Sequence, residues 1–108
     1  MKNQKSIDQE SLELYSKEYF IVISENGFIH IGRPKPINCP IMGDIIRVFD
    51  CYTIRRWGTS NGIGELCIKG KQESTILDYN GITDIQKNKV LQLLHIKETA
   101  LESYGFTK

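Results

Sequence analysis

Short runs of hydrophobic residues, separated by turn-forming residues, make up most of the chain. Tyr19–Ile23 is aromatic and β-branched, and Phe28–Ile31 returns to the same character after a polar break. Within the break, Asn26-Gly27 is typical of a type I′ turn, whose backbone twist matches that of the strands it joins. The pattern therefore predicts a β-hairpin over residues 19–31.

Upstream of this hairpin the spacing of apolar residues changes from strand-like to helical. Ser6–Gln9 has the form of a helix-capping box, and apolar residues follow at helical intervals up to Tyr19. A short N-terminal helix, or a partly ordered tail, is predicted for residues 1–18. Residues 19–108 are then expected to form a single β-rich domain.

The segment after the hairpin is rich in proline. Gly32–Pro40 contains all three prolines of the chain, and because proline lacks a backbone N–H it cannot lie inside a paired central strand. This segment is predicted to be a loop or a sheet edge. Ile45–Phe49 and Cys51–Trp57 predict two further strands, with a break near Asp50.

Between Gly58 and Gly70 the chain carries four glycines and a polar stretch. Thr59 or Ser60 could cap a short helix that ends at Gly70, but Glu65–Ile68 fits a strand equally well. The sequence does not separate these two alternatives.

The C-terminal third contains further short elements. The predicted ones are strands at Thr75–Leu77 and Ile82–Ile85 around an Asn80-Gly81 turn, a buried strand or helix at Val90–Ile96, and a helix at Glu98–Tyr104 ended by Gly105. Many short strands with helices near the ends indicate a small α+β domain dominated by antiparallel strands. Because the sheet would have open edges, a homo-oligomer is expected.

Composition places the chain among ordinary cytoplasmic domains. The length of 108 residues suits one domain, and no apolar run approaches the ~20 residues of a membrane helix. The first residues are polar and lack the core of a signal peptide, so a cytoplasmic location is expected. Cys39, Cys51 and Cys67 are widely spaced and are predicted to be reduced, buried and not metal-binding. His30 and His95 are interpreted as strand residues rather than ligands.

Charge is unevenly distributed along the chain. Residues 28–72 carry seven Lys or Arg against three acids, a net charge of +4. Residues 1–27 carry three against five, and residues 73–108 carry four against five. The basic middle favours an anionic partner, although its charge is too small to indicate duplex nucleic acid.

One block in this basic middle combines residue types suited to a phosphate-bearing ring. The candidate ligand-binding residues are Arg55, Arg56, Trp57, Thr59, Ser60, Asn61, Gly62 and Gly64. Guanidinium groups bind phosphate oxygens, hydroxyl and backbone N–H groups of a glycine-rich turn add donors, and an indole can stack on a base. The block matches neither a P-loop nor a dinucleotide-binding fingerprint.

A purely structural interpretation of the same block is also open. A single tryptophan in a small domain is commonly a core anchor, and glycines commonly serve turns. If Cys51–Trp57 is a strand, Arg55 and Arg56 point to opposite faces, so only one of them would reach a given pocket.

The block also resembles a group of short phage and prophage proteins of unassigned function. The similarity covers roughly residues 19–97 and is carried by Ile54-Arg55-x-Trp57-Gly58-Thr59-x-x-Gly62-x-Gly64-Glu65-Leu66, then Gly70, then Thr75-x-Leu77-Asp78. Lys71 stands where proline is expected in that group. The resemblance implies no catalytic residues, because none is assigned in the group.

Size and the implied phage origin suggest, by analogy, a protein that counters host defence. The leading hypothesis is sequestration of an anionic nucleotide immune signal, cyclic or ADP-ribose-type, without catalysis, cofactor or metal. The alternatives are a protein that inhibits a host defence enzyme or effector by contact, and a single-stranded nucleic-acid binder. A hydrolase ranks lowest, because Asp44, Asp50 and Glu65 lack any motif spacing.

Overall fold

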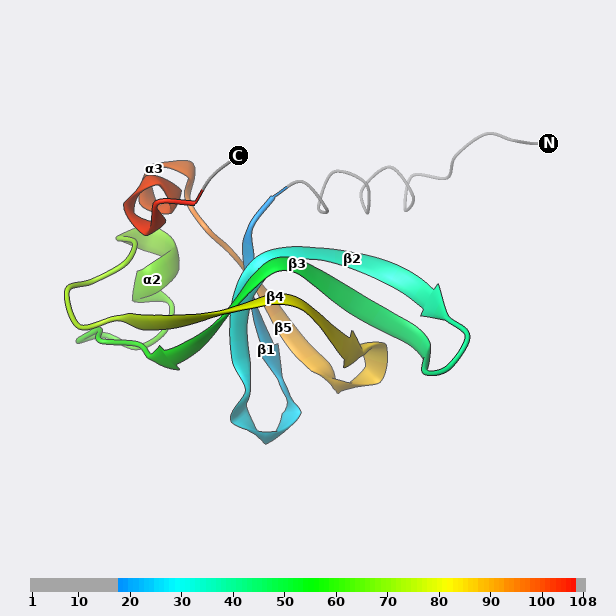
Figure 1. Ribbon diagram of the computed structural model, residues 1–108. Helices are drawn as coiled ribbons and strands as arrows, with labels where there is room; N and C mark the ends of the chain where they lie inside the picture. Colours follow the sequence, from blue (N-terminus) through cyan, green and yellow to red (C-terminus); the bar gives the residue numbers. More distant parts are fainter. Residues whose placement is uncertain (1–17, 107–108) are drawn as a thin grey trace.

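A computed structural model describes residues 18–106 of the chain. The described part is one antiparallel sheet of five strands in the order β4-β3-β2-β1-β5, with short helices beside it (Figure 1). This agrees with the predicted mostly-β domain. The predicted N-terminal helix lies outside the described residues.

The strands are β1 (Phe20–Ser24), β2 (Ile29–Cys39), β3 (Gly43–Arg56), β4 (Ile76–Gln86) and β5 (Val90–His95). The described α-helices, each about one turn long, are α2 (Glu65–Ile68) and α3 (Glu98–Leu101). Short 3-10 turns are η1 (Glu25–Gly27), η2 (Lys87–Lys89) and η3 (Glu102–Tyr104).

The predicted N-terminal hairpin is confirmed, but its turn is longer than expected. β1 and β2 pair from Phe20 opposite Gly32 to Ile23 opposite Ile29. The connection is η1 instead of a two-residue type I′ turn, with Gly27 at a φ of 79°. The backbone N–H and the hydroxyl of Ser24 both donate to the Phe28 carbonyl, which closes this wider turn.

Most of the proline-rich segment belongs to β2, at an edge of the sheet, and is not a loop. β1 pairs with β2 only as far as Gly32, whereas β3 follows β2 to its end. Pro34 lies opposite Val48 and Pro36 opposite Ile46, so among residues 18–106 both prolines have a neighbouring strand on one side only. At such an edge a missing N–H leaves no ladder bond unmade, because that side of the strand has no partner.

β3 and β4 are each one long strand where two short ones were predicted. The register between them shifts from Val48 to Cys51, and Asp50 at the shift has a φ of 50°. Gly81, opposite Cys51, has a φ of 82°. The break predicted near Asp50 and the turn predicted at Asn80-Gly81 are therefore the two sides of a bulge. The bulge bends the two strands without ending their pairing.

The remaining ambiguities are resolved in favour of a helix at α2 and a strand at β5. The residue that caps α2 is Gly64, with no side-chain cap bond, so neither Thr59 nor Ser60 serves as its N-cap. The predicted C-terminal helix is present as α3 and η3, and Gly105 ends it in the left-handed conformation at a φ of 69°.

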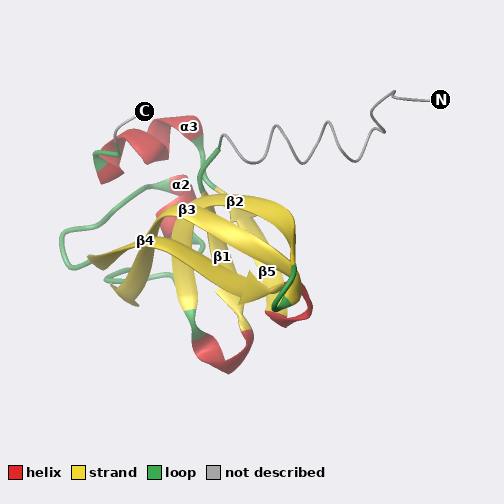
Figure 2. Ribbon diagram, turned by 45° about the vertical axis from the view of Figure 1, so that its right-hand side comes forward, coloured by secondary structure: helices red, strands yellow, loops and turns green. Residues whose placement is uncertain are grey.

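The sheet curls, so that strands at its two ends approach each other (Figure 2). Ile85 of β4 and Leu93 of β5 pack against the same buried cluster, and only η2 connects these two strands. We call this cluster the inner core. Its buried members are Val22, Val48 and Cys51.

The opposite face of the sheet is covered by the short helices. This outer core contains the buried residues Ile21, Ile31, Ile54, Leu66, Cys67 and Tyr104. The Tyr104 hydroxyl donates to the Leu66 carbonyl at 2.7 Å, which joins η3 to α2. β1 contributes Ile21 to one core and Val22 to the other, and this explains its unbroken apolar sequence.

The cysteines and histidines occupy mostly structural positions. Cys51 and Cys67 are buried as predicted, whereas Cys39 is only half-buried. His30 and His95 lie in β2 and β5, in agreement with their interpretation as strand residues. Within residues 18–106, none of the helices has the length and apolar character needed to cross a membrane.

Candidate functional site

The candidate block lies where β3 ends and the chain leaves the sheet toward α2. Arg55 and Arg56 are the last residues of β3, and Trp57 follows them directly. The polar residues Thr59–Asn61 and Gly62 form the loop that precedes α2. The block is thus divided between a rigid strand end and a loop.

Arg55 is engaged by an acidic residue of the neighbouring strand. Its Nε lies 2.7 Å from Oδ2 of Asp78, and its Nη2 lies 3.3 Å from Oδ1 of the same carboxylate. This fork-like geometry raises the pKa of Arg55, first through the hydrogen bond to Asp78 and then through its charge. Arg55 is therefore already satisfied within the sheet.

Two other arginines are also paired with an aspartate. The pairs are Arg33 with Asp50, Arg47 with Asp84, and Arg55 with Asp78. Asp78 and Asp84 come from the acidic C-terminal third, so β3–β4 pairing brings them onto the basic middle. The positive surface predicted from the charge count is reduced accordingly.

Arg56 differs from the other three arginines. Its side chain is exposed, and it has no ion pair with any residue in the described part of the chain. Its neighbour Arg55 bonds to Asp78, as expected for two consecutive strand residues with opposite directions. Of the two candidate arginines, only Arg56 keeps its donors for another molecule.

Trp57 is not the buried core anchor that its uniqueness suggested. Its side chain is 41% exposed. Its backbone is fixed nevertheless, because its carbonyl accepts a hydrogen bond of 2.6 Å from the hydroxyl of the buried Thr75. The indole is thus exposed at the surface, next to a backbone carbonyl that is held by Thr75.

Gly58, the next residue, lets the chain pass close to the segment that contains Ser74 and Thr75. It has a φ of 68°, and a Cβ at this position would overlap with backbone atoms of Ser74 and Thr75. The chain can pass this close only because glycine has no side chain. Gly58 is therefore a structural residue that positions Trp57.

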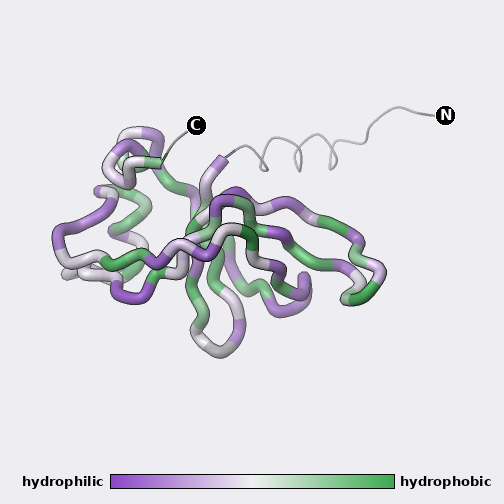
Figure 3. Tube along the Cα trace, viewed as in Figure 1, coloured by the Kyte–Doolittle hydropathy of each residue, from purple (hydrophilic) through white to green (hydrophobic). Residues whose placement is uncertain are grey.

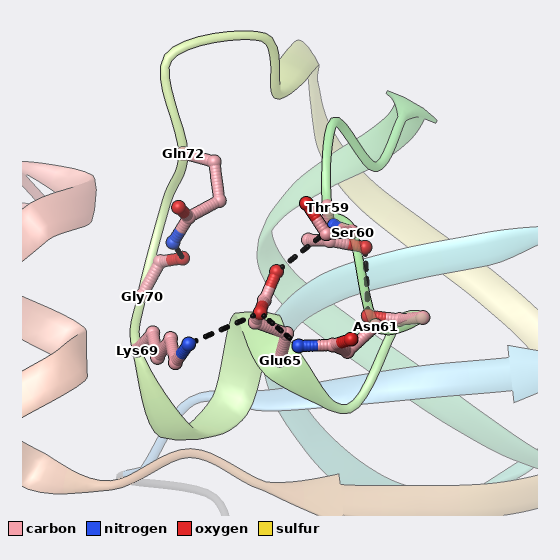
Figure 4. Close-up of polar contacts among 8 residues, drawn as sticks. Thr59, Ser60, Asn61, Glu65, Lys69, Gly70 and Gln72 are labelled. Carbon is pink, nitrogen blue, oxygen red and sulfur yellow. Dashed lines mark hydrogen bonds and ion pairs between the residues drawn. The ribbon is translucent and has the colours of Figure 1, made fainter.

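The polar groups of the loop bind a carboxylate of the chain itself (Figure 4). The Ser60 N–H donates to Oε1 of Glu65 at 3.1 Å, and the Asn61 amide donates to Oε2 at 3.0 Å. The Lys69 ammonium lies 3.4 Å from the same Oε2. Thr59 instead donates its hydroxyl to the Gly62 carbonyl at 2.7 Å.

These contacts make Glu65 the anion of the loop. Its side chain is only 8% exposed. Burial would raise the pKa of this carboxyl, but the bonds from Ser60, Lys69 and Asn61 outweigh it and lower the pKa. The donors of Ser60 and Asn61, which were predicted to bind an anionic ligand, therefore bind the Glu65 carboxylate of the same chain.

The other candidate glycines have unequal roles. Gly62 has a φ of 92°, which few other residues adopt, and so serves the turn. Gly64 has a φ of −59° and open space where a Cβ would lie. Nothing in the backbone requires glycine at residue 64.

The residues that complete this region were missed from the sequence. Asp78 and Glu65 decide which donors remain available, yet Asp78 lies 23 residues beyond its partner Arg55. Only the β3–β4 register brings that pair together. For Glu65 a local signal existed, because an acid four residues after Asn61 and four before Lys69 suits contacts across one turn.

Comparison of the chain with protein-family models, with curated proteins and with solved structures found no match. The resemblance to short phage proteins stays a prediction. Among the described residues, no three side chains of the metal-ligating types converge on one point.

Proposed function

We propose that this protein is a non-catalytic binding protein that holds an anionic nucleotide at the Arg56–Trp57 end of β3. In this proposal Arg56 binds the phosphate and the Trp57 indole stacks on the base. The observation that carries it is an exposed indole on a fixed backbone, directly next to an arginine with no acidic partner among the described residues.

The hydrogen bond to the Trp57 carbonyl favours a binding role for the indole. A side chain whose backbone is already ordered loses less conformational entropy when a ligand covers it. Stacking of a base on an aromatic ring is worth about 1–3 kcal/mol, and a charge-assisted hydrogen bond about 1.5–3 kcal/mol. Together these contacts would suit a small ligand that spans Arg56 at the end of β3 and Trp57 directly after it.

The absence of catalysis in this proposal is supported by the state of the reactive groups. Asp50, Asp78 and Asp84 are each paired with arginine. Burial raises the pKa of Cys51, and it raises the pKa of Cys67 to about 11, so both thiols stay protonated near neutral pH. General acid–base chemistry needs converging titratable groups, and three of the described aspartates are engaged by arginine instead.

The test is calorimetric titration of the full chain with ADP-ribose and with a cyclic dinucleotide. Arg56→Ala should weaken binding at least tenfold, whereas Lys35→Ala, an equal loss of charge on the exposed edge of β2, should leave it nearly unchanged. Ligand recovered after denaturation should be intact. Equal affinity of Arg56→Ala and the parent protein would contradict the proposal, as would a hydrolysed ligand.

The ligand class is tested by a salt series. A nucleotide with few charges should lose little affinity between 50 and 200 mM salt, whereas a strand with many phosphates loses much more. Tight, strongly salt-dependent binding of single-stranded oligonucleotides, with no binding of the small nucleotides, would favour the single-stranded nucleic-acid alternative.

The alternative of a protein–protein inhibitor has one observation in its favour. The turn between β2 and β3 is an exposed apolar tip, visible at the right-hand end of the molecule in Figure 3. Ile41 in this turn is 93% exposed and Met42 is 41% exposed. Capture of one host protein by the parent chain, lost in Ile41→Asp but retained in Arg56→Ala, would assign the activity to this tip.

A further inference from the structure

A hollow whose lining includes neither Arg56 nor Trp57 lies at the bulge of β3. It is an open hollow of about 210 Å³, lined by Tyr19, Asp50, Tyr52, Tyr79 and Phe106. Four of these five residues are aromatic, and Asp50 is the one acid. Ligand pockets for drug-sized molecules run from about 300 Å³ upward, so this hollow suits a group of side-chain size.

The aromatic rings form a continuous wall. Tyr19 stacks on Phe106 with ring centroids 4.4 Å apart and an angle of 12° between the planes. Tyr52 lies 5.0 Å from Phe106 and 5.0 Å from Tyr79, at 31° and 57°. These rings touch one another, so no slot remains between them for a flat molecule.

Asp50 is brought to this wall by an unusual backbone. Its φ of 50° places it in the left-handed region, which residues other than glycine adopt uncommonly, although aspartate and asparagine do so more often than most. The register shift between Val48 and Cys51 occurs at the same point. Bulges redirect side chains and often occur next to binding sites.

The carboxylate of Asp50 is only half used by the protein. Nε and Nη2 of Arg33 both donate to its Oδ2. Its Oδ1 accepts no hydrogen bond from the described residues, and the side chain is 43% exposed. One carboxylate oxygen at the aromatic wall is therefore available to a donor from outside.

We propose that this hollow binds an alkylated ammonium group that carries at least one N–H. The faces of tyrosine and phenylalanine rings are electron-rich and attract cations, and alkyl substituents pack on them. The N–H would donate to Oδ1 of Asp50. The site goes beyond the proposed nucleotide function and does not depend on it.

Arg33 tunes this site and makes it testable. The guanidinium orients Asp50 through Oδ2, but its positive charge also opposes an incoming cation. Removal of that charge in Arg33→Gln should therefore strengthen ammonium binding, by about threefold or more. A site for a neutral ring would show no such gain.

The experiment is an NMR titration of the full chain with trimethylammonium at neutral pH, following the tyrosine ring signals. Trimethylammonium carries one N–H, tetramethylammonium has the charge without it, and tert-butanol has a similar shape without charge. We expect trimethylammonium to bind most tightly, with tert-butanol at least tenfold weaker. Asp50→Asn should weaken binding at least tenfold, and Asp44→Asn, an exposed acid elsewhere, should not change it.

Tyr79→Ala provides a variant that should fold in any case, because Tyr79 is 64% exposed on the edge strand β4. It should weaken trimethylammonium binding several-fold. Three results would each overturn the proposal: tert-butanol or free adenine binding as tightly as trimethylammonium, unchanged affinity in Asp50→Asn, or weaker binding in a folded Arg33→Gln. None of these results bears on Arg56, so the nucleotide proposal is judged separately.

Discussion

The two cores of this domain are closed in different ways. The inner core is enclosed by the curled sheet itself, since Ile85 near one end of the sheet and Leu93 near the other pack on Val22 and Val48. The outer core needs cover from outside the sheet, and Leu66 of α2 supplies part of it. Backbone pairing therefore secures the inner core, whereas the outer core depends on side chains from short helices.

Both candidate sites lie on the side of the domain that depends on the helices and the final residues. Both the Arg56–Trp57 end of β3 and the Asp50 hollow belong to regions where the sheet meets the helix-bearing segments or the final residues. Helices of about one turn have little stability of their own, so tertiary packing must hold them. The outer core is thus the place where substitutions should disturb the sites through stability.

The largest effect is expected at Leu66, which is fully buried in the outer core. Leu66→Ala should lower the free energy of unfolding by about 2–5 kcal/mol, because it removes buried methyl groups and leaves a cavity. Ile68→Ala on the same helix is the matched control, since Ile68 is 59% exposed and should change the stability little. Chemical denaturation measures both, and equal effects would mean that α2 does not close the core.

The next effect compares two glycines of the candidate block. Gly58→Ala should cost roughly 1–3 kcal/mol, because it forces a left-handed φ on alanine and a clash with Ser74 and Thr75. Gly64→Ala should be neutral or slightly stabilising, since its φ is −59° and the space is open. Thermal unfolding of both variants tests the pair. A destabilised Gly64→Ala would mean that this glycine has a role the backbone does not reveal.

Local sequence patterns were sufficient to predict the fold class. They were not sufficient to predict where strands bend or where their pairing stops. The β1–β2 hairpin and the helix ended by Gly105 were predictable because turn and cap signals lie within a few residues of the elements. The single long β3 was not predictable, since Asp50 resembles a strand break unless the opposite strand is known. The same holds for the prolines of β2, which are tolerated because β1 begins at Phe20, opposite Gly32, and does not pair with the residues of β2 that follow.

The sequence named the residues of the candidate block but did not show which of them bind other residues of the chain. Arg55 and Arg56 are equivalent in the sequence, but β4 supplies Asp78 to one of them alone. The donors of the loop were predicted to bind an anionic ligand, and in the structure those of Ser60 and Asn61 bind Glu65 of the same chain. Pairing across the sheet decides which donors stay free, and no local spacing encodes it.

A smaller effect on stability, which depends on pH, should come from His30, on the face of the sheet that carries Val22. His30 lies opposite Val22 and is buried, and its Nδ1 has no hydrogen-bond partner among the described residues. Burial lowers the pKa of His30, so the folded state favours the neutral ring. Stability should be full above pH 6.5, the ordinary value of histidine, and should fall as the pH drops below it, because the unfolded chain takes up the proton more readily.

The check is thermal unfolding at pH 7.5 and pH 5.5 for the parent protein and for His30→Gln. The parent should lose stability at the lower pH, and the variant should lose less of it. An identical loss in both proteins would assign the pH dependence to other groups.

The smallest effect on stability is expected at Trp57, and it separates a ligand contact from a packing contact. A buried tryptophan replaced by alanine costs about 3–5 kcal/mol, but Trp57 is 41% exposed and Thr75 binds its backbone carbonyl, which alanine retains. Trp57→Ala should therefore lower the free energy of unfolding by less than about 1 kcal/mol, as surface substitutions usually do. Binding of the nucleotide that calorimetry identifies should weaken about tenfold in the same variant, because stacking on the indole is worth about 1–3 kcal/mol. Trp57→Phe is the informative control, since it keeps an aromatic face and should retain part of the affinity that Trp57→Ala loses. A loss of several kcal/mol in stability with unchanged affinity would instead place Trp57 with Leu66 among the residues that hold the outer core.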